Sequence, residues 1–453
     1  MPALKFIHCS DIHLGRQRLG GKLPDEDFAR ALGYIVQVAL EQRVDGLLVA
    51  GDLYDSPSIQ PPILQQAINC LMPLQEANIP IFIIEGNHDR ATVTGETHTW
   101  VRYLNDIGLV HLLSIPFNAE GPVLTPWDDT AKRGSYIDYK GVRIIGAGYL
   151  GAGTIKRARL ISEAMDQWQE PVPTAKIMLL HAGPDYMVQE GGGFSKETLE
   201  FLHERVDYLA LGHIHKPLNH DGWAVNPGSP EHVRLEECRY DGQPRGMAVM
   251  EIDPFAPHPL QRAEILSVPK RRVINLRYDC SPHGNKTKRA MDGIQQEVAT
   301  LLKEAGAGSE DAVRLELTGA VNLGRIRLDT DALATFLEEK LPVKAVEINS
   351  GGLQLATGDI VGAETADTSP SRESIELRAI SDLVWEHPLA GLEEHTDLVA
   401  DLFYQLKEDV RNKLGSEEIR ERLNTNSLVD RLVAEMLAEM PERSVASAKD
   451  GDN

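Results

Sequence analysis

Short apolar runs that end in polar residues recur along the first half of the chain. The first three lie at residues 4–9, 47–50 and 79–85, and amphipathic segments at 28–42 and 63–76 separate them. Short continuous apolar runs are typical of strands buried on both faces of a parallel sheet, and the segments between them have helical periodicity. This alternation predicts βαβ units and an α/β fold class.

Polar side chains follow each of these three predicted strands. Asp11 and His13 come after the first, Asp52 after the second, and Asn87 and His88 after the third. The carboxyl ends of parallel strands form one edge, where open α/β sheets bind their ligands. Asp11 and His13 are two positions apart, so an extended backbone projects both side chains to one side. A single Gly-Asp pair is usually a turn, but three polar strand ends predict a binding site.

Two further predicted strands end in histidines. Residues 176–180 lead to His181, and residues 208–211 lead to Gly-His-Ile-His at 212–215. One histidine at a strand end is more often structural, but strand alternation directs His213 and His215 the same way. The pair therefore favours a second group of ligands.

A glycine-rich sequence follows another predicted strand at residues 141–145. Residues 146–151 match the pattern GxGxxG of dinucleotide-binding folds. That fingerprint normally opens the first βα unit of its domain, whereas this one follows strands already assigned to another site. We therefore expect a glycine-rich loop near the rim of the active site.

The second half of the chain has a different character from about residue 270 onward. Strand and helix patterns alternate there, at residues 272–278, 291–304, 312–318, 331–340 and 345–348. They predict a small α+β module, either a capping domain or a plain structural appendage. We divide the chain into a core at 1–268, an α+β cap at 269–351, a linker at 352–371, a helical segment at 372–440 and a disordered end at 441–453.

The tail from Ala366 is acidic and has two apolar stripes at helical spacing. It contains 20 acidic and 10 basic residues. The stripes are formed by Leu398, Leu402, Leu406 and Val410, and by Leu428, Leu432 and Met436. Such helices are not stable alone, so they either pack back on the body of the protein or bind a partner.

Composition narrows the classes of protein that this sequence can encode. The 453 residues are enough for two or three domains, and no apolar run is long enough to span a membrane, so we expect a cytoplasmic protein. Four scattered cysteines without CxxC spacing are expected to be reduced and mostly buried. The net charge of −22 argues against non-specific binding to phosphate backbones, so any nucleic-acid contact must be local or assisted by cations or a partner.

Taken together, the polar residues at the strand ends form a candidate metal centre. They are Asp11, His13, Asp52, Asn87, His88, His181, His213 and His215. Carboxylates, neutral imidazoles and an amide oxygen suit Mn²⁺, Fe²⁺ or Zn²⁺ better than Ca²⁺. The set is too large for one ion, and two ions about 3.5–4 Å apart are the arrangement that clamps a phosphoryl group.

The order D-x-H, G-D, G-N-H-D, H and G-H-x-H over residues 11–215 resembles the calcineurin-like metallophosphoesterase superfamily. The blocks at 6–15, 50–55 and 86–89 are most similar to the DNA double-strand-break-repair nucleases. The bacterial form of these nucleases is SbcD, and a YhaO-type subgroup of exonucleases is close to it. The resemblance implies a metallophosphoesterase β-sandwich core flanked by helices, with a cap and a C-terminal helical tail.

The resemblance also implies roles for individual residues. Asp11, His13 and His215 would hold one metal ion, Asn87, His181 and His213 would hold a second, and Asp52 would bridge them. His88 would meet the scissile phosphate and protonate or stabilise the leaving oxygen. Some relatives carry a histidine three residues after the bridging aspartate, where this chain has Asp55.

The activity implied by the resemblance is a manganese-dependent 3′–5′ exonuclease and single-strand endonuclease in DNA repair and recombination. The implied cofactor is two divalent ions, with Mn²⁺ expected. The implied partners are DNA, an SMC-like coiled-coil ATPase bound by the helical segment, and a second copy of the chain.

Two other functions remain open at this point. The same core could act on small nucleotides or phosphoproteins, which the acidic charge favours, or the chain could be a metal-stabilised scaffold. A nuclease predicts that Lys270, Arg271 and Arg272 form a basic strip facing the metals, whereas a small-nucleotide enzyme predicts a closed pocket.

Overall fold

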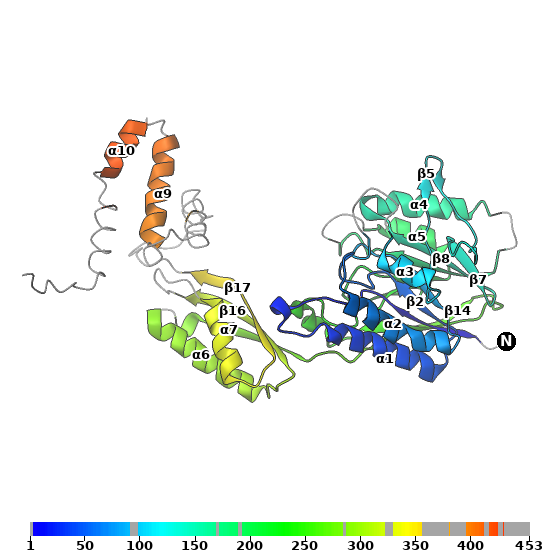
Figure 1. Ribbon diagram of the computed structural model, residues 1–453, viewed down its shortest axis with the longest axis horizontal. Helices are drawn as coiled ribbons and strands as arrows, with labels where there is room; N and C mark the ends of the chain where they lie inside the picture. The colour runs from blue at the N-terminus through cyan, green and yellow to red at the C-terminus, as the bar shows by residue number, and fades with distance from the viewer. Residues whose placement is uncertain are drawn as a thin grey trace, which may run out of the picture. The chain divides into compact units, whose positions relative to one another are not determined.

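The structure is a computed structural model, and its residues fall into two units. It describes residues 3–90, 98–168, 172–188, 193–283, 287–321, 329–355, 380, 396–411, 416–424 and 429. The first unit comprises residues 1–323 and 328–355, and the second comprises residues 324–327 and 356–453. The first unit therefore contains both the expected core and the expected cap (Figure 1).

Two six-stranded sheets form the core of the first unit (Figure 1). Along the first sheet the strands are β14 (Leu260–Ser267), β13 (Gly246–Ile252), β1 (Leu4–Cys9), β2 (Gly46–Ala50), β3 (Ile81–Ile84) and β4 (His111–Leu112). Along the second they are β11 (Leu218–His220), β12 (Ala224–Asn226), β10 (Tyr208–Leu211), β9 (Ala175–His181), β8 (Val142–Tyr149) and β7 (Tyr136–Tyr139). A separate hairpin joins β5 (Phe117–Asn118) to β6 (Gly121–Pro122).

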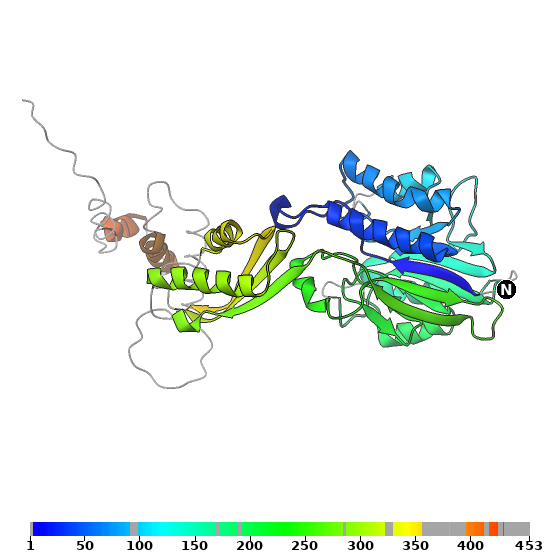
Figure 2. The same ribbon diagram turned by 90° about the horizontal axis from the view of Figure 1, so that it is seen from below.

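Helices cover the outer faces of these sheets. α1 (Glu26–Gln42) and α2 (Pro61–Glu76) share a buried cluster with the first sheet, and Figure 2 shows these two blue helices outside the layers of strands. α4 (Thr154–Met165) and α5 (Lys196–His203) pack on the second sheet. A third buried cluster, which includes Phe6, Leu48, Ile144 and Leu179, lies between the sheets. This is the expected sandwich flanked by helices, with α3 (Trp100–Asp106) packed beside β4.

The parallel strands expected from the sequence are present. β1, β2 and β3 are neighbours and run parallel, as do β8, β9 and β10 in the second sheet. Each group of parallel strands thus ends at one edge, and the polar residues of the candidate metal centre follow those ends.

The glycine-rich stretch after residue 145 is not a loop over its first half. β8 continues through Gly146 and Gly148 to Tyr149, with a register irregularity between the two glycines. A Cβ at Gly146 would lie 2.3 Å from Cβ of Leu113 and 2.8 Å from Cγ2 of Ile84, so glycine is needed for this close approach. The strand brings the Tyr149 ring to within 5.6 Å of the His213 ring, at the rim of the site.

The cap has α/β connectivity, whereas the sequence led us to expect α+β. Its strands β15 (Val273–Asp279), β16 (Ala312–Val321) and β17 (Ala345–Leu355) form a parallel sheet. α6 (Thr287–Glu304) connects the first pair, and α7 (Thr330–Lys340) lies between the second pair along the chain. Parallel neighbours require a crossover connection, and each of the two helices lies in one.

Part of the tail lies within the described residues. α9 (Thr396–Arg411) covers the first expected stripe, where Leu402 and Leu406 are half-buried and Val410 is 65% exposed, and α10 (Ser416–Asn424) follows it. The second stripe at Leu428, Leu432 and Met436, most of the linker and the end from residue 441 lie outside the described residues.

The other compositional expectations can be compared with the structure directly. All four cysteines are free thiols; Cys9 and Cys280 are buried, whereas Cys70 and Cys238 are half-buried. Among the residues that the structure describes, no helix is both long and apolar enough to cross a membrane.

Candidate metal centre

The two sheets meet at the site through His181. This residue ends β9 of the second sheet, and its Nδ1 donates a hydrogen bond of 2.8 Å to the carbonyl of Ala50 at the end of β2 in the first sheet. Strand ends from both sheets therefore contribute to a single cluster of polar side chains.

One group of candidate ligands consists of Asp11, His13 and His215. Each residue offers one atom that could bind a metal ion, and these three atoms all lie within 4.8 Å of one another. Nε2 of His13 and Nε2 of His215 are 3.2 Å apart, and the Asp11 side chain is fully buried. Both imidazoles thus direct the same ring nitrogen towards one place.

A second group consists of Asn87, His181 and His213. Oδ1 of Asn87 lies 3.1 Å from Nε2 of His181 and 3.0 Å from Nδ1 of His213. Asp52 lies between the two groups, because its Oδ2 is 3.2 Å from Nε2 of His181 and 3.8 Å from Nε2 of His13. The structure thus brings all seven expected ligands together.

The hydrogen bonds around His181 show that a cation fits this site. Because Nδ1 donates to Ala50, Nε2 of the neutral ring carries a lone pair. That lone pair faces the amide oxygen of Asn87 and the carboxylate of Asp52, so three acceptors converge. Such an arrangement needs a proton or a metal ion between the acceptors, and the donor set is one that borderline divalent metals prefer.

The pKa values show the same demand for positive charge. Burial lowers the pKa of His181, but the adjacent Asp52 carboxylate outweighs this and raises it to about 9. Burial raises the pKa of Asp52, yet the interaction with His181 outweighs it and holds that pKa well below its usual range. Burial and the charge on His181 lower the pKa of His213 to about 4, so this ring is a neutral ligand at pH 7.

Two hydrogen bonds hold His88 beside the same cluster. Its backbone N–H donates to Oδ1 of Asp52 at 2.9 Å, and its ring Nδ1 donates to the carbonyl of Asp55 at 2.8 Å. The other ring nitrogen, Nε2, is therefore free to act on a ligand of the site. His88, His13 and Asp52 each offer one atom that could bind a metal ion, and these three atoms lie within 4.8 Å of one another.

The backbone at the site is left-handed rather than extended. Asp11, His13 and Asp52 have φ values of 53°, 52° and 53°, and His213 has a φ of 81°. These conformations are unfavourable for residues other than glycine, and such residues cluster at functional sites. Hydrogen bonds between the two loops hold them, including Asp11 N–H to Gly51 O and His13 N–H to Asp52 O, both at 3.1 Å.

The prediction from strand alternation was therefore wrong for His213 and His215, whereas Asp11 and His13 do share one ligand group, although tight turns and not an extended strand bring them together. β1 ends at Cys9 and β10 at Leu211, before the motifs begin. His213 contacts Asn87 of the second group, whereas His215 contacts His13 of the first. Alternation applies only within a regular strand, and these residues lie in tight turns beyond one.

Two carboxylates contact the candidate ligands: Glu237, which sequence reasoning missed, and Asp55, which it named without this contact. Oε1 of Glu237, in a short 3₁₀ helix at Leu235–Tyr240, lies 2.7 Å from Nδ1 of His215. Oδ1 of Asp55 lies 3.2 Å from Nδ1 of His13. Glu237 belongs to no motif. Metal-binding histidines often donate their second N–H to a carboxylate, so the sequence could have been searched for such a partner.

The expected basic strip at residues 270–272 is engaged in internal contacts. Arg271 is buried and donates to both oxygens of Asp27, and Arg272 donates to Asp311. Lys270 donates to the carbonyl of Val268. Acidic side chains that are distant in the sequence pair with both arginines, so these residues do not form the free cationic surface that we expected.

Comparison with known proteins identifies the relatives of this chain. The family model for calcineurin-like phosphoesterases matches residues 4–217. The chain is 26% identical to the DNA double-strand break repair protein Mre11 of Archaeoglobus fulgidus, over 86% of this chain and 85% of that protein. It is 22% identical to the protein of that name from Aeropyrum pernix, over 93% and 96% respectively. It is also 26% identical to the SbcD component of the nuclease SbcCD of Staphylococcus saprophyticus, over 58% of this chain and 71% of that protein.

Proposed function

We propose that this chain, whose residues 4–217 match the family model for calcineurin-like phosphoesterases, is a metal-dependent hydrolase that cleaves phosphodiester bonds in DNA. The similarity to the two Mre11 proteins extends over most of this chain and most of each of those proteins, so it includes the cap and part of the tail. The observation that carries the proposal is the convergence of Asp52, Asn87 and His181 as three acceptors around one point.

The side chains of the site have distinct tasks in this reaction. Two divalent ions, when bound, supply Lewis-acid chemistry that neutralises charge on a phosphate and makes water more acidic. Asp11, His13 and His215 would hold the first ion, and Asn87, His181 and His213 the second, with Asp52 contacting both. The left-handed turns hold these ligands in place before substrate binds, so little reorganisation accompanies the reaction.

His88 acts on the leaving group. Its Nδ1 donates to the carbonyl of Asp55, so Nε2 is the nitrogen that meets the phosphate ester. With both ring nitrogens protonated, the imidazolium donates a hydrogen bond or a proton from Nε2 to the departing sugar oxygen and keeps the proton on Nδ1. The hydrogen bond from its backbone N–H to Asp52 holds the residue beside the metal ligands.

The finer assignments follow from the resemblance of the motifs to the repair nucleases. We propose Mn²⁺ as the metal, 3′–5′ exonuclease and single-strand endonuclease activities, and a role as the nuclease component beside an SMC-like ATPase. The region at 372–440, which includes α9, is the proposed partner-binding segment, and the cap at 269–351 the proposed DNA-contacting domain. A second copy of the chain and a cytoplasmic location complete the proposal.

Cleavage of end-labelled DNA tests this function. The full chain with Mn²⁺ should degrade duplex DNA labelled at the 3′ or 5′ end and should cut single strands. His88→Ala and Asp52→Ala should abolish cleavage, whereas His258→Ala, which removes an exposed histidine outside the site, should leave it unchanged. Intact DNA alongside Mn²⁺-dependent hydrolysis of bis-nitrophenyl phosphate would refute the stand-alone nuclease and retain the hydrolase.

One observation favours a second substrate class. The net charge is −22, and Arg271 and Arg272 are paired with acidic residues rather than free to bind a DNA backbone. A phosphoesterase that acts on small nucleotides or phosphoproteins needs no such surface. It would hydrolyse nucleotide diesters or phosphopeptides under conditions in which labelled DNA stays intact.

A further inference from the structure

We propose that Glu237 is a positioning residue of the metal centre, which sets the orientation and tautomer of the ligand His215. The inference rests on the proposed metal site. It concerns a residue that lies 22 positions beyond the last ligand in the sequence and belongs to none of the motifs.

The two side chains are in direct contact. Oε1 of Glu237 lies 2.7 Å from Nδ1 of His215. A carboxylate only accepts hydrogen bonds, so this contact places the proton of the imidazole on Nδ1. The lone pair is then on Nε2, which is the nitrogen that faces His13 of the same ligand group at 3.2 Å.

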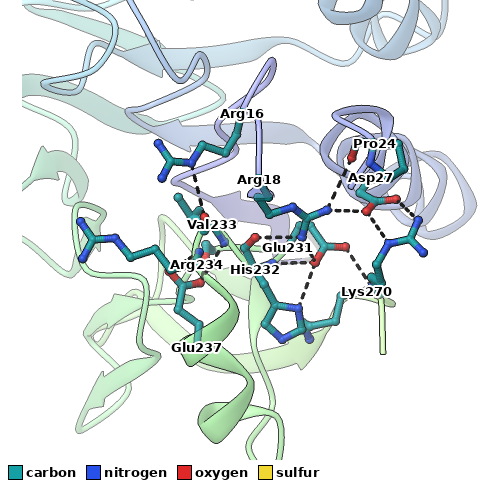
Figure 3. Close-up of polar contacts among 12 residues, drawn as sticks. Arg16, Arg18, Pro24, Asp27, Glu231, His232, Val233, Arg234, Glu237 and Lys270 are labelled. Carbon is teal, nitrogen blue, oxygen red and sulfur yellow. Dashed lines mark hydrogen bonds and ion pairs between the residues drawn. The ribbon is translucent and has the colours of Figure 1, made fainter. Parts of the chain in front are cut away.

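Glu237 is itself held in place. Its side chain is buried, and its Oε2 accepts from Ser229 Oγ at 3.1 Å, Val233 N at 3.1 Å and Arg245 Nη1 at 3.2 Å. Arg245 is fully buried. The close-up in Figure 3 shows the Glu237 carboxylate turned towards the backbone at Val233 and Arg234.

The two oxygens of Glu237 have different partners. Three donors from the protein occupy Oε2, whereas Oε1 accepts from the backbone N–H of Arg234 at 3.3 Å and has its shortest contact with the candidate ligand. A role confined to local stability would need only the Oε2 contacts and the bond from Arg234. The contact of Oε1 with His215 acts instead on the ring that would bind the metal, as carboxylate partners of metal-binding histidines do.

Because the two oxygens have different partners, Glu237→Gln tests the contact with His215 specifically. The donors around Oε2 require an acceptor, so the oxygen of the glutamine amide should take that position. The NH₂ group then faces Nδ1 of His215 and forces it to accept. The proton moves to Nε2, which can no longer bind a metal ion, although side-chain volume and most local contacts are kept.

Calorimetric titration of the full chain with Mn²⁺ measures the effect. We expect Glu237→Gln to weaken binding of one of the two ions about 10- to 100-fold and to leave the other unchanged. Glu236→Gln is the matched control, because it removes the neighbouring carboxylate of the same helix, which lines a cavity with Arg16 and Arg314. DNA cleavage by Glu237→Gln should recover as Mn²⁺ is raised, which a loss of folded protein would not produce.

A spectroscopic measurement on the unsubstituted chain keeps the test independent of how the variant folds. In the chain loaded with diamagnetic Zn²⁺ and labelled with ¹⁵N-histidine, Nδ1 of His215 should be protonated and Nε2 should be bound to the metal. The signal is assigned by its loss in His215→Gln.

The outcomes separate this inference from the proposed function. Unchanged Mn²⁺ affinity in Glu237→Gln, or a proton on Nε2 of His215 in the Zn²⁺-loaded chain, overturns the role of Glu237. A chain that binds two Mn²⁺ ions and depends on Glu237, but cleaves no DNA, supports the inference and refutes the nuclease. A chain that binds no Mn²⁺ overturns both.

Discussion

Gly86 lies so close to Asp52 that no side chain fits between them. A Cβ added at position 86 would be 2.0 Å from Oδ1 of Asp52 and 2.5 Å from its backbone nitrogen. These distances are far below any normal contact, so the Asp52 carboxylate would have to move. At the scale of single residues, the glycine before the third polar strand end is therefore part of what positions the proposed bridging ligand.

We predict that Gly86→Ala lowers Mn²⁺-dependent hydrolysis of bis-nitrophenyl phosphate by about 100-fold, the usual effect of a misplacement of about 1 Å at an active site. Gly33→Ala in α1 is the matched control, because a Cβ there meets nothing within 4 Å. It should retain activity and gain about 0.5–1 kcal/mol in the free energy of unfolding. Full activity in Gly86→Ala would show that Asp52 does not need its observed position.

At the scale of elements, a buried ion-pair network joins three parts of the first unit. Asp27 comes from α1, Glu231 from the segment after β12, and Arg271 from the residues that lead into β15 of the cap. Figure 3 shows Arg18 between Asp27 and Glu231, and its Nη1 lies 3.3 Å from Oε1 of Glu231. Arg271 donates its backbone N–H to Glu231 and its guanidinium to Asp27. The start of the cap is thus tied to the core by charge, and a small apolar cluster in which Leu23 and Leu235 meet Ala312 and Ala345 adds to this contact.

Glu231→Gln should therefore be strongly destabilising. It leaves the buried Arg18 without one of its anionic partners, and breaking a buried ion pair costs about 3–5 kcal/mol in the free energy of unfolding at pH 7. Urea denaturation measures the change. Glu163→Gln, which breaks an exposed pair with Arg159, should change stability by less than about 1 kcal/mol.

The cost of Glu231→Gln should depend on pH. Burial raises the pKa of Glu231, but His232 and Arg18 outweigh it and lower the pKa to about 2, against an ordinary 4.5. Because the folded pKa is the lower one, the carboxylate stabilises the fold fully above pH 4.5 and loses this effect as the pH falls towards 2. The difference in the free energy of unfolding between the unsubstituted chain and Glu231→Gln should therefore decrease as the pH falls below 4.5. A gap that stays constant from pH 7 to pH 3 would contradict the role of the ionised carboxylate.

At the scale of the whole molecule, the net charge of −22 and the cluster of acceptors both favour bound cations. A metal that binds only the folded chain stabilises it by about 2.7 kcal/mol when its free concentration is 100 times the dissociation constant. The melting temperature therefore reports metal binding without reference to any substrate.

We predict that EDTA lowers the melting temperature of the full chain relative to saturating Mn²⁺, measured by calorimetry. The difference should be much smaller in Asp52→Ala, which lacks the carboxylate between the two ligand groups. The His258→Ala control should behave like the unsubstituted chain. Equal melting temperatures with Mn²⁺ and with EDTA would argue against a metal centre at these residues.

The sequence by itself determined the elements of the core and the membership of the site. The strand at residues 4–9 and the helix at 28–42 are local consequences of hydrophobic periodicity, and they appear as β1 and α1. The polar residues after the parallel strands could be identified because strand ends of one sheet share an edge. Position in the chain was enough to predict that these side chains come together.

Only the tertiary structure decided how those residues are held and which others assist them. The left-handed turns at Asp11 and His213, the contact of Glu237 with His215 and the burial of Arg271 depend on hydrogen bonds and ion pairs between segments distant in the chain. The same is true of the parallel order of the cap strands, since periodicity identifies a strand but not its neighbours. Local pattern specifies elements, whereas long-range contacts specify their geometry and charge environment.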